Sequence, residues 1–486
     1  MNQIKPPPPA PVPAAPAPRP RRRLLRRPGP AADAGPARLS PGRGCATPRP
    51  DTRSARTVPP PEFVLAEQSV AVIGAGIVGL ATAWHLHRDG HRVVILDPAP
   101  EGDKASFGNA GGIANTEIVP AAVPGLLWKV PRWLLDPLGP LAIRPAYAPR
   151  LLPWLRAFLA AGRPAEVARI AAALAALNGL IEGDLAAMLA ATGLAGELHR
   201  PGALTVYESL AARRRDEAEW SLKRAHAIAA EDLSGAEARA LEPALGPAVA
   251  CAVFTPQWCH VNDPKQLTDR LREWLRAAGV AIRAARVLAI EPQGEADIRL
   301  ALEGGEAPRF AHVVVAAGAW SGILARRLGE RVLLESERGY NTTVADPGVA
   351  LQREVIFAER KFVATPLSIG LRIGGAAEFG GLDAPAHPRR AEALARLARI
   401  YLPGLRAEGG VAWSGHRPTT PDSLPVIGRS LRHGNVFHAF GHGHLGLTQA
   451  ATTGRLIADL LARREPPIDL APYSIARFQR RAGSRP

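Results

Sequence analysis

Three glycines and an aspartate have the spacing that binds the phosphates and ribose of a dinucleotide. Gly74, Gly76 and Gly79 follow the apolar run 70–73, and Asp97 lies 23 residues after Gly74, at the end of a second apolar run. The first glycine of such a fingerprint permits a tight turn, the second lets N–H groups approach a pyrophosphate, and the third lets helix and strand pack. The carboxylate can accept hydrogen bonds from the ribose. The predicted dinucleotide contacts are Gly74, Ala75, Gly76, Ile77, Val78, Gly79 and Asp97.

Two further stretches have the composition of loops that pass close to a bound group. Residues 105–116 (ASFGNAGGIANT) are rich in small side chains, which would let the backbone pass beside a flat ring; a surface turn is the alternative. Residues 436–461 predict a strand, a loop of glycines and histidines, and a long helix. The amides and dipole at the start of that helix would stabilise an anion.

The elements around these loops predict two kinds of sheet. Apolar runs at 70–73, 93–96 and 309–317 are typical of buried parallel strands, and the first and last lead through a glycine into a helix. Short alternating segments predict an antiparallel sheet. These segments are 335–344, 354–357, 362–365 and 370–379. The Pro-rich stretch 413–428 is expected to be irregular until a buried strand at its end.

The sequence therefore predicts an α/β fold with a parallel-sheet dinucleotide domain and a second α+β domain built on an antiparallel sheet. Insertions interrupt the dinucleotide-binding elements, so we expect each domain in several parts. The first domain comprises 67–118, 255–332 and 408–475, and the second comprises 119–254 and 333–407. The end 476–486 is expected to fray.

The formal net charge of +16 is concentrated at the start of the chain. Residues 1–66 contain 12 Lys and Arg, three acidic residues and 18 of the 48 prolines, a composition that cannot bury enough apolar surface to fold. The run 21–27 (RRRLLRR) lacks the apolar region that a twin-arginine signal requires. A patch for nucleic acid or anionic lipid is the alternative to a solvated tail, and we expect the tail.

Cysteine content and hydropathy indicate the compartment. Cys45, Cys251 and Cys259 form neither a CxxC pair nor an even disulfide framework, which favours a reducing compartment and predicts a cytoplasmic protein. No apolar run in the sequence reaches the roughly 18 residues that can span a bilayer. The sequence shows no metal-ligand cluster.

Residues 119–162 combine short apolar stretches, prolines, and interleaved aromatic and basic side chains. Such stretches suit a membrane interface, and they suit a surface packed between domains equally well. The hypothesis of a peripheral contact with the inner face of the cytoplasmic membrane therefore rests on 121–160. The residues concerned are Trp128, Lys129, Arg132, Trp133, Arg150, Trp154, Arg156 and Phe158.

Four stretches together resemble the D-amino-acid oxidase (DAO) family of flavoproteins. They are the glycine fingerprint with Asp97, the SFGNAGG loop, the RGY segment at 338–340, and the pair GHRPTTPDSLPVIG and GHGHLGLT. The SFxNAG and RGY stretches are most similar to the bacterial D-amino-acid dehydrogenase branch. The resemblance covers about 66–475 and implies FAD, which we expect to be bound non-covalently. A single glycine fingerprint, with no second one for NADH, agrees with it.

The resemblance implies that an amino acid loses a hydride from its α-carbon to flavin N5, and that the imino acid hydrolyses to a keto acid and ammonia. Arg417, in GHRP, would bind the substrate carboxylate, Tyr340 would add a hydroxyl donor, and His444 would contact flavin or pack beside it. His442 is expected to orient its loop. The remaining implied flavin contacts are Ser106, Asn109, Gly111, Gly112, Val287, Ala317, Gly318, Gly441, His442, Gly443, Gly446, Leu447 and Thr448.

Three alternatives stay open at this point. The electron acceptor could be oxygen, although a membrane quinone or the respiratory chain is expected for a dehydrogenase. The substrate could be a cyclic or secondary amine, such as a hydroxyproline isomer or sarcosine, or glycine. An RNA-binding or RNA-modifying flavoprotein that uses the basic tail is the alternative from another class, and we do not expect a nucleic-acid partner.

Overall fold

The computed structural model describes residues 69–125 and 139–479. All of these described residues belong to one compact unit. The tail predicted for 1–66 and the residues Trp128, Lys129, Arg132 and Trp133 lie outside the described residues.

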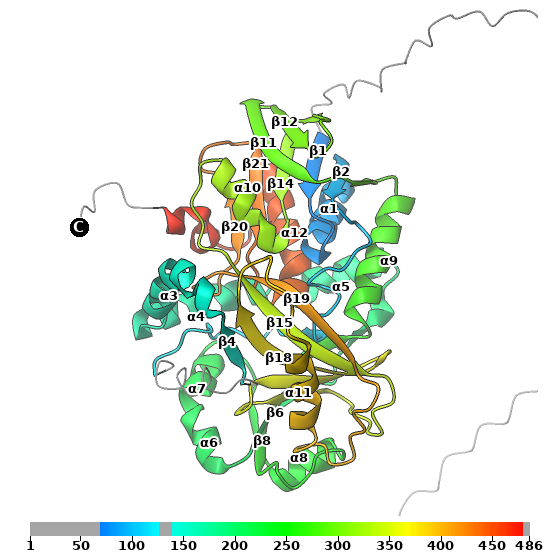
Figure 1. Cartoon of the computed structure of the whole chain (residues 1–486), viewed down its shortest axis with the longest axis vertical. Helices are drawn as coiled ribbons and strands as arrows, with labels where there is room; N and C mark the ends of the chain where they lie inside the picture. Colours follow the sequence, from blue (N-terminus) through cyan, green and yellow to red (C-terminus); the bar gives the residue numbers. More distant parts are fainter. Residues whose placement is uncertain (1–68, 126–138, 480–486) are drawn as a thin grey trace, which may run out of the picture. The chain divides into compact units, whose positions relative to one another are not determined.

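The central sheet carries the glycine fingerprint. Its described strands have the order β10-β2-β1-β14-β21-β20, and all pair in parallel except β20, which is antiparallel to β21 at one edge. In Figure 1 its strands are blue, green and orange because they come from three separate parts of the chain. The strands are β1 (Ser69–Ile73), β2 (Arg92–Asp97), β10 (Ala281–Ala284), β14 (His312–Val315), β20 (Val426–Arg429) and β21 (Val436–Phe440). The parallel sheet and its three-part origin were predicted.

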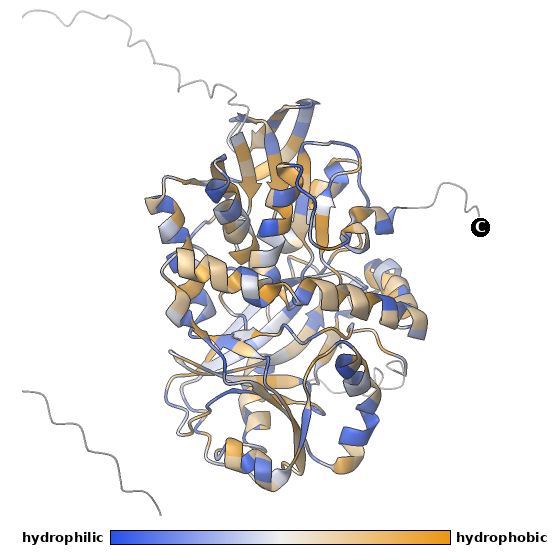
Figure 2. Ribbon diagram, turned by 180° about the vertical axis from the view of Figure 1, so that it is seen from behind, coloured by the Kyte–Doolittle hydropathy of each residue, from blue (hydrophilic) through white to orange (hydrophobic). Residues whose placement is uncertain are grey.

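The inner strands of the central sheet are buried on both faces, whereas the edge strand β10 is partly exposed. Every residue of β1 and β21 is buried, and Figure 2 shows the strands of this sheet coloured largely as hydrophobic. Helices α1 (Ile77–Arg88) and α12 (Gly446–Leu461) pack on one another at this sheet (Figure 1). Gly454 allows the close approach, because a Cβ there would lie 2.7 Å from the Ala81 carbonyl oxygen. Residues of both helices share one apolar cluster with Val70 and Val72.

The large sheet contains the antiparallel strands that the sequence predicted. Among the described residues its strands have the order β19-β15-β18-β17-β16-β6-β8-β7, with β4 paired to β18. The antiparallel part was predicted from the alternating segments. The strands are β4 (Leu141–Ile143), β6 (Ala203–Tyr207), β7 (Glu231–Ser234), β8 (Cys251–Thr255), β15 (Glu335–Val344), β16 (Glu354–Phe357), β17 (Phe362–Leu367), β18 (Gly370–Phe379) and β19 (Val411–Thr419).

Two of the local expectations were wrong. The Pro-rich start of 413–428 is not irregular: it forms the edge strand β19, and Pro418 is compatible with that position because an edge strand leaves one side unpaired. The run 309–317 is not one strand, because β13 (Arg309–Phe310) pairs with β12 (Asp297–Leu302), whereas β14 belongs to the central sheet.

The remaining elements connect and cover the two sheets. The small strands are β3 (Gly112–Ile113), β5 (Leu198–His199), β9 (Cys259–Val261) and β11 (Val287–Gly294). The helices are α3 (Ala148–Ala161), α4 (Pro164–Asn178), α5 (Ile181–Ala191), α6 (Leu210–Arg215), α7 (Glu217–Ala225), α8 (Gly235–Leu241), α9 (Pro264–Ala277), α10 (Ser321–Arg327) and α11 (Pro388–Ala398). Short 3-10 turns are Pro145–Tyr147, Ala195–Glu197, Gly318–Trp320, Ala471–Tyr473 and Ile475–Phe478.

One helical stretch differs from the expectation that no segment is apolar enough for a bilayer. By length and composition, Pro164–Ala191 could cross a membrane, although it is partly buried inside the protein. Its buried side chains, such as Ile170 and Leu185, lie in the same apolar cluster as α1 and α12. Asn178 accepts a hydrogen bond from the Gln449 amide of α12 at 3.0 Å, so the stretch packs on the core of the described structure.

Candidate functional site

The three fingerprint glycines are glycines for different reasons. A Cβ on Gly74 would lie 2.4 Å from the Ala316 carbonyl oxygen, and a Cβ on Gly79 would lie 2.0 Å from the Gly74 carbonyl oxygen. These two positions are restricted by the protein itself. Gly76 has an ordinary φ of −75°, and its Cβ would meet only the Ser106 hydroxyl, at 3.7 Å. The space at Gly76 therefore fits a group that approaches the backbone from outside, as a pyrophosphate does.

Helix α1 begins at Gly76 with amides directed toward that space. In the described structure, neither α1 nor α12 has a side-chain cap or an acidic residue in its first turn. Ser106 reaches this helix end, because its hydroxyl accepts the Ile77 N–H at 3.1 Å. Open amides at a helix start favour an anion. The half-buried Val78 belongs to the same turn.

Asp97 lies at the carboxyl end of β2, where the fingerprint requires an acidic residue. Its carboxylate accepts the N–H groups of Ala75 and Ala99, both at 2.8 Å, and contacts Lys104 Nζ at 3.1 Å. The aspartate therefore closes the glycine turn in addition to facing the ribose position. Lys104 was not predicted, because a single lysine next to a loop carries no sequence signal.

The second strand–glycine–helix corner lies at the same edge of the central sheet. Ala317 and Gly318 follow β14, and Gly318 has a positive φ of 54°. Val287 begins β11, just after Ala284, which pairs with Asp97. The three residues predicted here thus lie at the carboxyl ends of β14 and β10, where open α/β sheets bind ligands.

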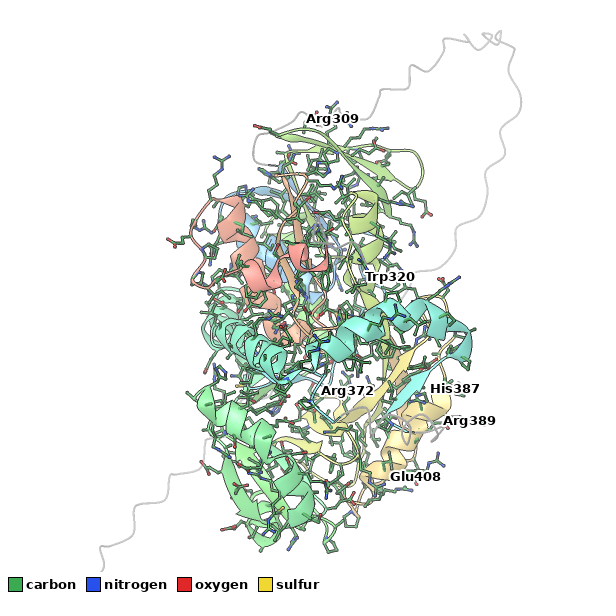
Figure 3. All side chains as sticks on the ribbon, turned by 90° about the vertical axis from the view of Figure 1, so that its left-hand side faces the viewer. Arg309, Trp320, Arg372, His387, Arg389 and Glu408 are labelled. Atoms are coloured by element: carbon green, nitrogen blue, oxygen red, sulfur yellow. The ribbon has the colours of Figure 1, made fainter. Side chains whose placement is uncertain are left out.

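The small-residue loop, defined as 105–112, is held against the large sheet. Arg372 on β18 donates to the carbonyl oxygens of Phe107 at 3.1 Å and Asn109 at 2.7 Å, and Asn341 on β15 donates to that of Gly108 at 2.7 Å. Arg372 is buried in the interior (Figure 3). Sequence reasoning missed Arg372 and Asn341, because both are ordinary residues of alternating strands.

Asn109 joins this loop to the glycine–histidine loop, defined as 441–445. Its amide donates to the His444 carbonyl oxygen at 3.4 Å, and its own oxygen accepts the Gly111 N–H at 2.8 Å. The predicted Gly111 and Gly112 lead from it into β3, and the Ala114 N–H donates to the Thr448 hydroxyl at 3.1 Å. The two predicted cofactor loops therefore meet.

The glycine–histidine loop leads directly into α12. Gly441 and Gly443 have positive φ values of 83° and 53°, which favour glycine. His442 is buried and shares a 2.9 Å hydrogen bond with the Thr453 hydroxyl, and burial lowers its pKa to about 3. His442 thus orients the loop as a neutral ring. Of the residues that begin α12, Gly446 is half-buried and open, whereas the Leu447 side chain is part of the core.

Arg417 lies on β19, opposite Glu337 of β15. Its Nη1 atom donates to Glu337 Oε1 at 2.8 Å and to the Ala376 carbonyl oxygen at 3.4 Å, and about a quarter of the side chain is exposed. A Cβ on Gly339 would lie 2.5 Å from Arg417 Cζ. The glycine of the RGY segment therefore makes room for the guanidinium, and Glu337 is a neighbour that the motifs did not reveal.

His444 lies close to this pair. Burial lowers the pKa of His444, while smaller effects of Glu337 and Arg417 oppose one another. Its side chain is nevertheless exposed. His444 is therefore an accessible residue within electrostatic reach of both charged side chains. Arg417, Glu337 and His444 are thus neighbours, and the bridge between Thr419 and His442 joins β19 to the glycine–histidine loop.

Trp413 lies on the face of the large sheet that carries Arg417 and Glu337, next to the small-residue loop. Its ring packs where a Cβ on Gly108 or Gly415 would lie, at 2.0 Å and 2.1 Å. Its Nε1 atom is buried without a partner in the described structure. The tryptophan was not predicted to belong to the site, since it was assigned to an irregular stretch.

Tyr340 does not lie where the resemblance implied. Odd-numbered residues of β15, such as Glu337 and Asn341, face Arg417 and the small-residue loop, whereas Tyr340 points to the opposite face. There it is fully buried among residues of α11 and contacts Glu378. We therefore withdraw the role of Tyr340 as a substrate hydroxyl donor. Arg338 shares this opposite face.

The described residues contain no group of three or more His, Cys, Asp or Glu that could hold a metal ion. Cys251 and Cys259 are free and buried, and burial raises the pKa of both thiols, that of Cys259 to about 11. Neither lies in the loops described above. The donor set of the site thus consists of backbone amides, Arg417 and neutral histidines.

A buried carboxyl group, that of Glu354, packs against the small-residue loop. Glu354 is fully buried, accepts the Trp258 Nε1–H at 3.3 Å, and occupies the position where a Cβ of Gly112 would lie, 2.1 Å from its Oε2. Burial raises the pKa of Glu354 to about 7. The group is therefore a proton-bearing carboxylic acid at mildly acidic pH.

Replacing Glu354 with glutamine should stabilise the protein at pH 8 more than at pH 5. As pH rises from about 4.5 to 7, the unfolded carboxyl ionises while the folded one keeps its proton, so stability falls over this window and then levels off. Removing this penalty should add on the order of 3 kcal/mol to the free energy of unfolding above pH 7. Chemical denaturation at both pH values measures it, with the exposed Glu273→Gln as the control. A gain independent of pH would contradict the assignment.

Comparison with known proteins agrees with this arrangement. The model of the family described as FAD dependent oxidoreductase (DAO) matches residues 69–460. The D-amino-acid oxidase of Bradyrhizobium diazoefficiens is 36% identical over 419 residues, covering 84% of this chain and 98% of that protein. D-amino acid dehydrogenase 2 of Ralstonia nicotianae is 35% identical over 428 residues, covering 84% of this chain and 100% of that protein.

A solved structure shows the same fold. Glycine oxidase from Geobacillus kaustophilus has a TM-score of 0.65 and 24% identity, covering 85% of this chain and 99% of the other. The family implies FAD, and the open space at Gly76, at the start of a helix without an acidic residue in its first turn, fits that cofactor. From the family match, the fold and the site, we conclude that this chain belongs to the DAO family of FAD-dependent oxidoreductases.

Proposed function

We propose that this protein oxidises amino acids at the α-carbon, with D-amino acids as its substrates, to imino acids that hydrolyse to keto acids and ammonia. The observation that carries the proposal is Arg417, a guanidinium within electrostatic reach of His444, on the strand β19 that is bridged to the glycine–histidine loop. The relatives named D-amino-acid oxidase and D-amino acid dehydrogenase support the choice of enantiomer.

When bound, FAD supplies the acceptor of a hydride from the substrate α-carbon, at its N5 atom. The chain's own groups bind and orient. Arg417 holds the substrate carboxylate, which fixes the direction of the Cα–H bond. The open amides at the start of α12 would stabilise negative charge on the flavin ring, and His442 holds the loop that leads into them. These contacts would hold FAD non-covalently.

The decisive experiment is a screen of D- and L-amino acids with a dye acceptor, with and without oxygen. The panel includes hydroxyproline isomers, sarcosine and glycine, which are the alternative substrates named above. We expect turnover of D-enantiomers with the dye. Turnover of only L-enantiomers would contradict the substrate, and turnover that requires oxygen would contradict the dehydrogenase assignment.

We also propose that the electron acceptor is a membrane quinone and that α3 touches the lipid surface. Trp154 does not take part, because it is buried and donates to the Thr419 carbonyl oxygen at 3.1 Å, and Phe158 stacks on it. The outer face of α3 supports the contact instead: Leu152 and Leu159 are 49% and 44% exposed, with exposed Arg156 between them. Apolar and basic residues on one exposed helix face suit an anionic bilayer.

Wild-type protein should float with anionic liposomes, and the Leu152→Glu/Leu159→Glu variant should remain in the soluble fraction. Burying a leucine contributes about 1.5–3 kcal/mol, so losing two half-exposed ones should lower membrane partitioning at least about tenfold. Leu210→Glu, at an exposed leucine of α6, is the matched control and should float as wild type does. If wild type itself fails to float, α3 has no membrane role.

A further inference from the structure

The candidate substrate arginine already has an acidic partner. Glu337 Oε1 lies 2.8 Å from Arg417 Nη1, and its other oxygen accepts the Thr419 hydroxyl at 3.2 Å. Both charged side chains are largely but not completely buried. A binding site for a simple carboxylate would be stronger without Glu337, because the glutamate neutralises the charge that attracts the ligand. Its presence needs a reason connected with the ligand.

The geometry leaves room for a second carboxylate on the same guanidinium. Only Nη1 of Arg417 contacts Glu337, and the Nε and Nη2 atoms lie over Gly339, where a Cβ would be about 2.6 Å away. Because Gly339 has no side chain, the guanidinium packs closely over this residue, and in the described structure Nε and Nη2 donate to no protein group, which leaves this edge of the fork for a ligand. A ligand carboxylate on that edge would have Glu337 as its neighbour.

The charges then determine which ligand fits. With a carboxylate bound, one guanidinium faces two carboxylates, and the neutral His444 adds no charge, since burial lowers its pKa. The excess negative charge is balanced only when the ligand brings its own cation. A zwitterionic amino acid does so through its ammonium group, whereas a monocarboxylate or a 2-hydroxy acid does not.

We propose that Glu337 is a specificity-determining residue that selects zwitterionic amino acids over carboxylates without an amino group. The proposal rests on the proposed function, because it assigns the substrate carboxylate to Arg417. Glu337 repels a carboxylate ligand that has no amino group, because the two charges are alike. It attracts an amino acid through the ammonium group of that ligand. Glu335, on the same face, does not share this role, since it is bound to the Tyr147 hydroxyl at 2.7 Å.

The test compares an amino acid with its desamino analogue in FAD-loaded protein. Propionate binding is titrated through the flavin absorbance. D-alanine is measured by kcat/KM and through the concentration dependence of anaerobic flavin reduction, or by the same absorbance titration if no reduction occurs. Glu337→Gln keeps the size of the side chain and its contact with Thr419. It should bind propionate about tenfold more tightly and D-alanine more weakly, so the preference for the zwitterion falls at least tenfold. Glu337→Asp should restore part of it.

The matched control is Glu378→Gln, which removes an equivalent carboxylate, paired with Arg144, from the opposite face of the large sheet. Its selectivity should equal that of wild type. If Glu337→Gln changes both affinities by the same factor, Glu337 only positions Arg417 and the proposal is wrong. If the glutamine variant loses FAD, the same comparison of the two affinities is made with Glu337→Asp. If the protein oxidises no amino acid, the proposed function fails, while the two titrations still measure charge selection.

Discussion

Replacing Arg417 with alanine should lower kcat/KM for the best amino acid on the order of 100-fold, while FAD stays bound. Charged hydrogen bonds contribute roughly 1.5–3 kcal/mol each, and losing about 3 kcal/mol of transition-state binding gives a factor of this size. The alanine removes the guanidinium that pairs with Glu337, and Arg372, another described cation on this face of the large sheet, is already bound to the carbonyl oxygens of Phe107 and Asn109. Steady-state kinetics with a dye acceptor measures the loss, and the flavin spectrum confirms occupancy.

Two comparisons make the Arg417 result specific. Arg417→Lys should recover only part of the activity, because an ammonium keeps the charge but not the two-pronged geometry. An amine substrate without a carboxylate should react poorly with wild type and lose little more in the variant. Activity within about threefold of wild type, roughly 0.65 kcal/mol, would mean that Arg417 is a structural residue. Arg338 could not take its place, since it faces the other side of the sheet.

Gly76→Val should give a soluble, folded and colourless protein that contains at most about a tenth of the wild-type FAD. The valine side chain fits the protein, because only the Ser106 hydroxyl lies within 4 Å of the new Cβ and φ at this position is ordinary. It would instead occupy the space through which the pyrophosphate reaches the amides at the start of α1. Flavin released on denaturation, relative to protein, measures the occupancy.

Gly79→Val is the matched control for this prediction. Its Cβ would lie 2.0 Å from the Gly74 carbonyl oxygen, so it should destabilise the fold as well as abolish binding. Circular dichroism and thermal unfolding separate the two variants, with Gly76→Val expected to keep a cooperative transition. Full flavin occupancy in Gly76→Val would overturn the assignment of the cofactor site.

The antiparallel strands show the limit of sequence reasoning. Segments β15 to β18 were predicted from their alternation, but β19 was not, because GHRP and the prolines after it are typical of a loop. At the sheet edge a proline costs no ladder hydrogen bond, and pairing with β15 supplies the rest. Arg417 was therefore expected in an irregular stretch, whereas it lies on a strand whose pairing with β15 sets its distance from Glu337.

The sequence by itself determined the parts of this protein that are local. The glycine turn, its strand and helix, Asp97 and the loops at 105–112 and 441–445 follow from backbone sterics and helix-end electrostatics within short stretches. Only the tertiary structure decided the substrate side. Because strand side chains alternate, the register of β15 against β19 places Glu337 beside Arg417 and turns Tyr340 away. Register depends on contacts between residues about 80 positions apart, which no local pattern contains.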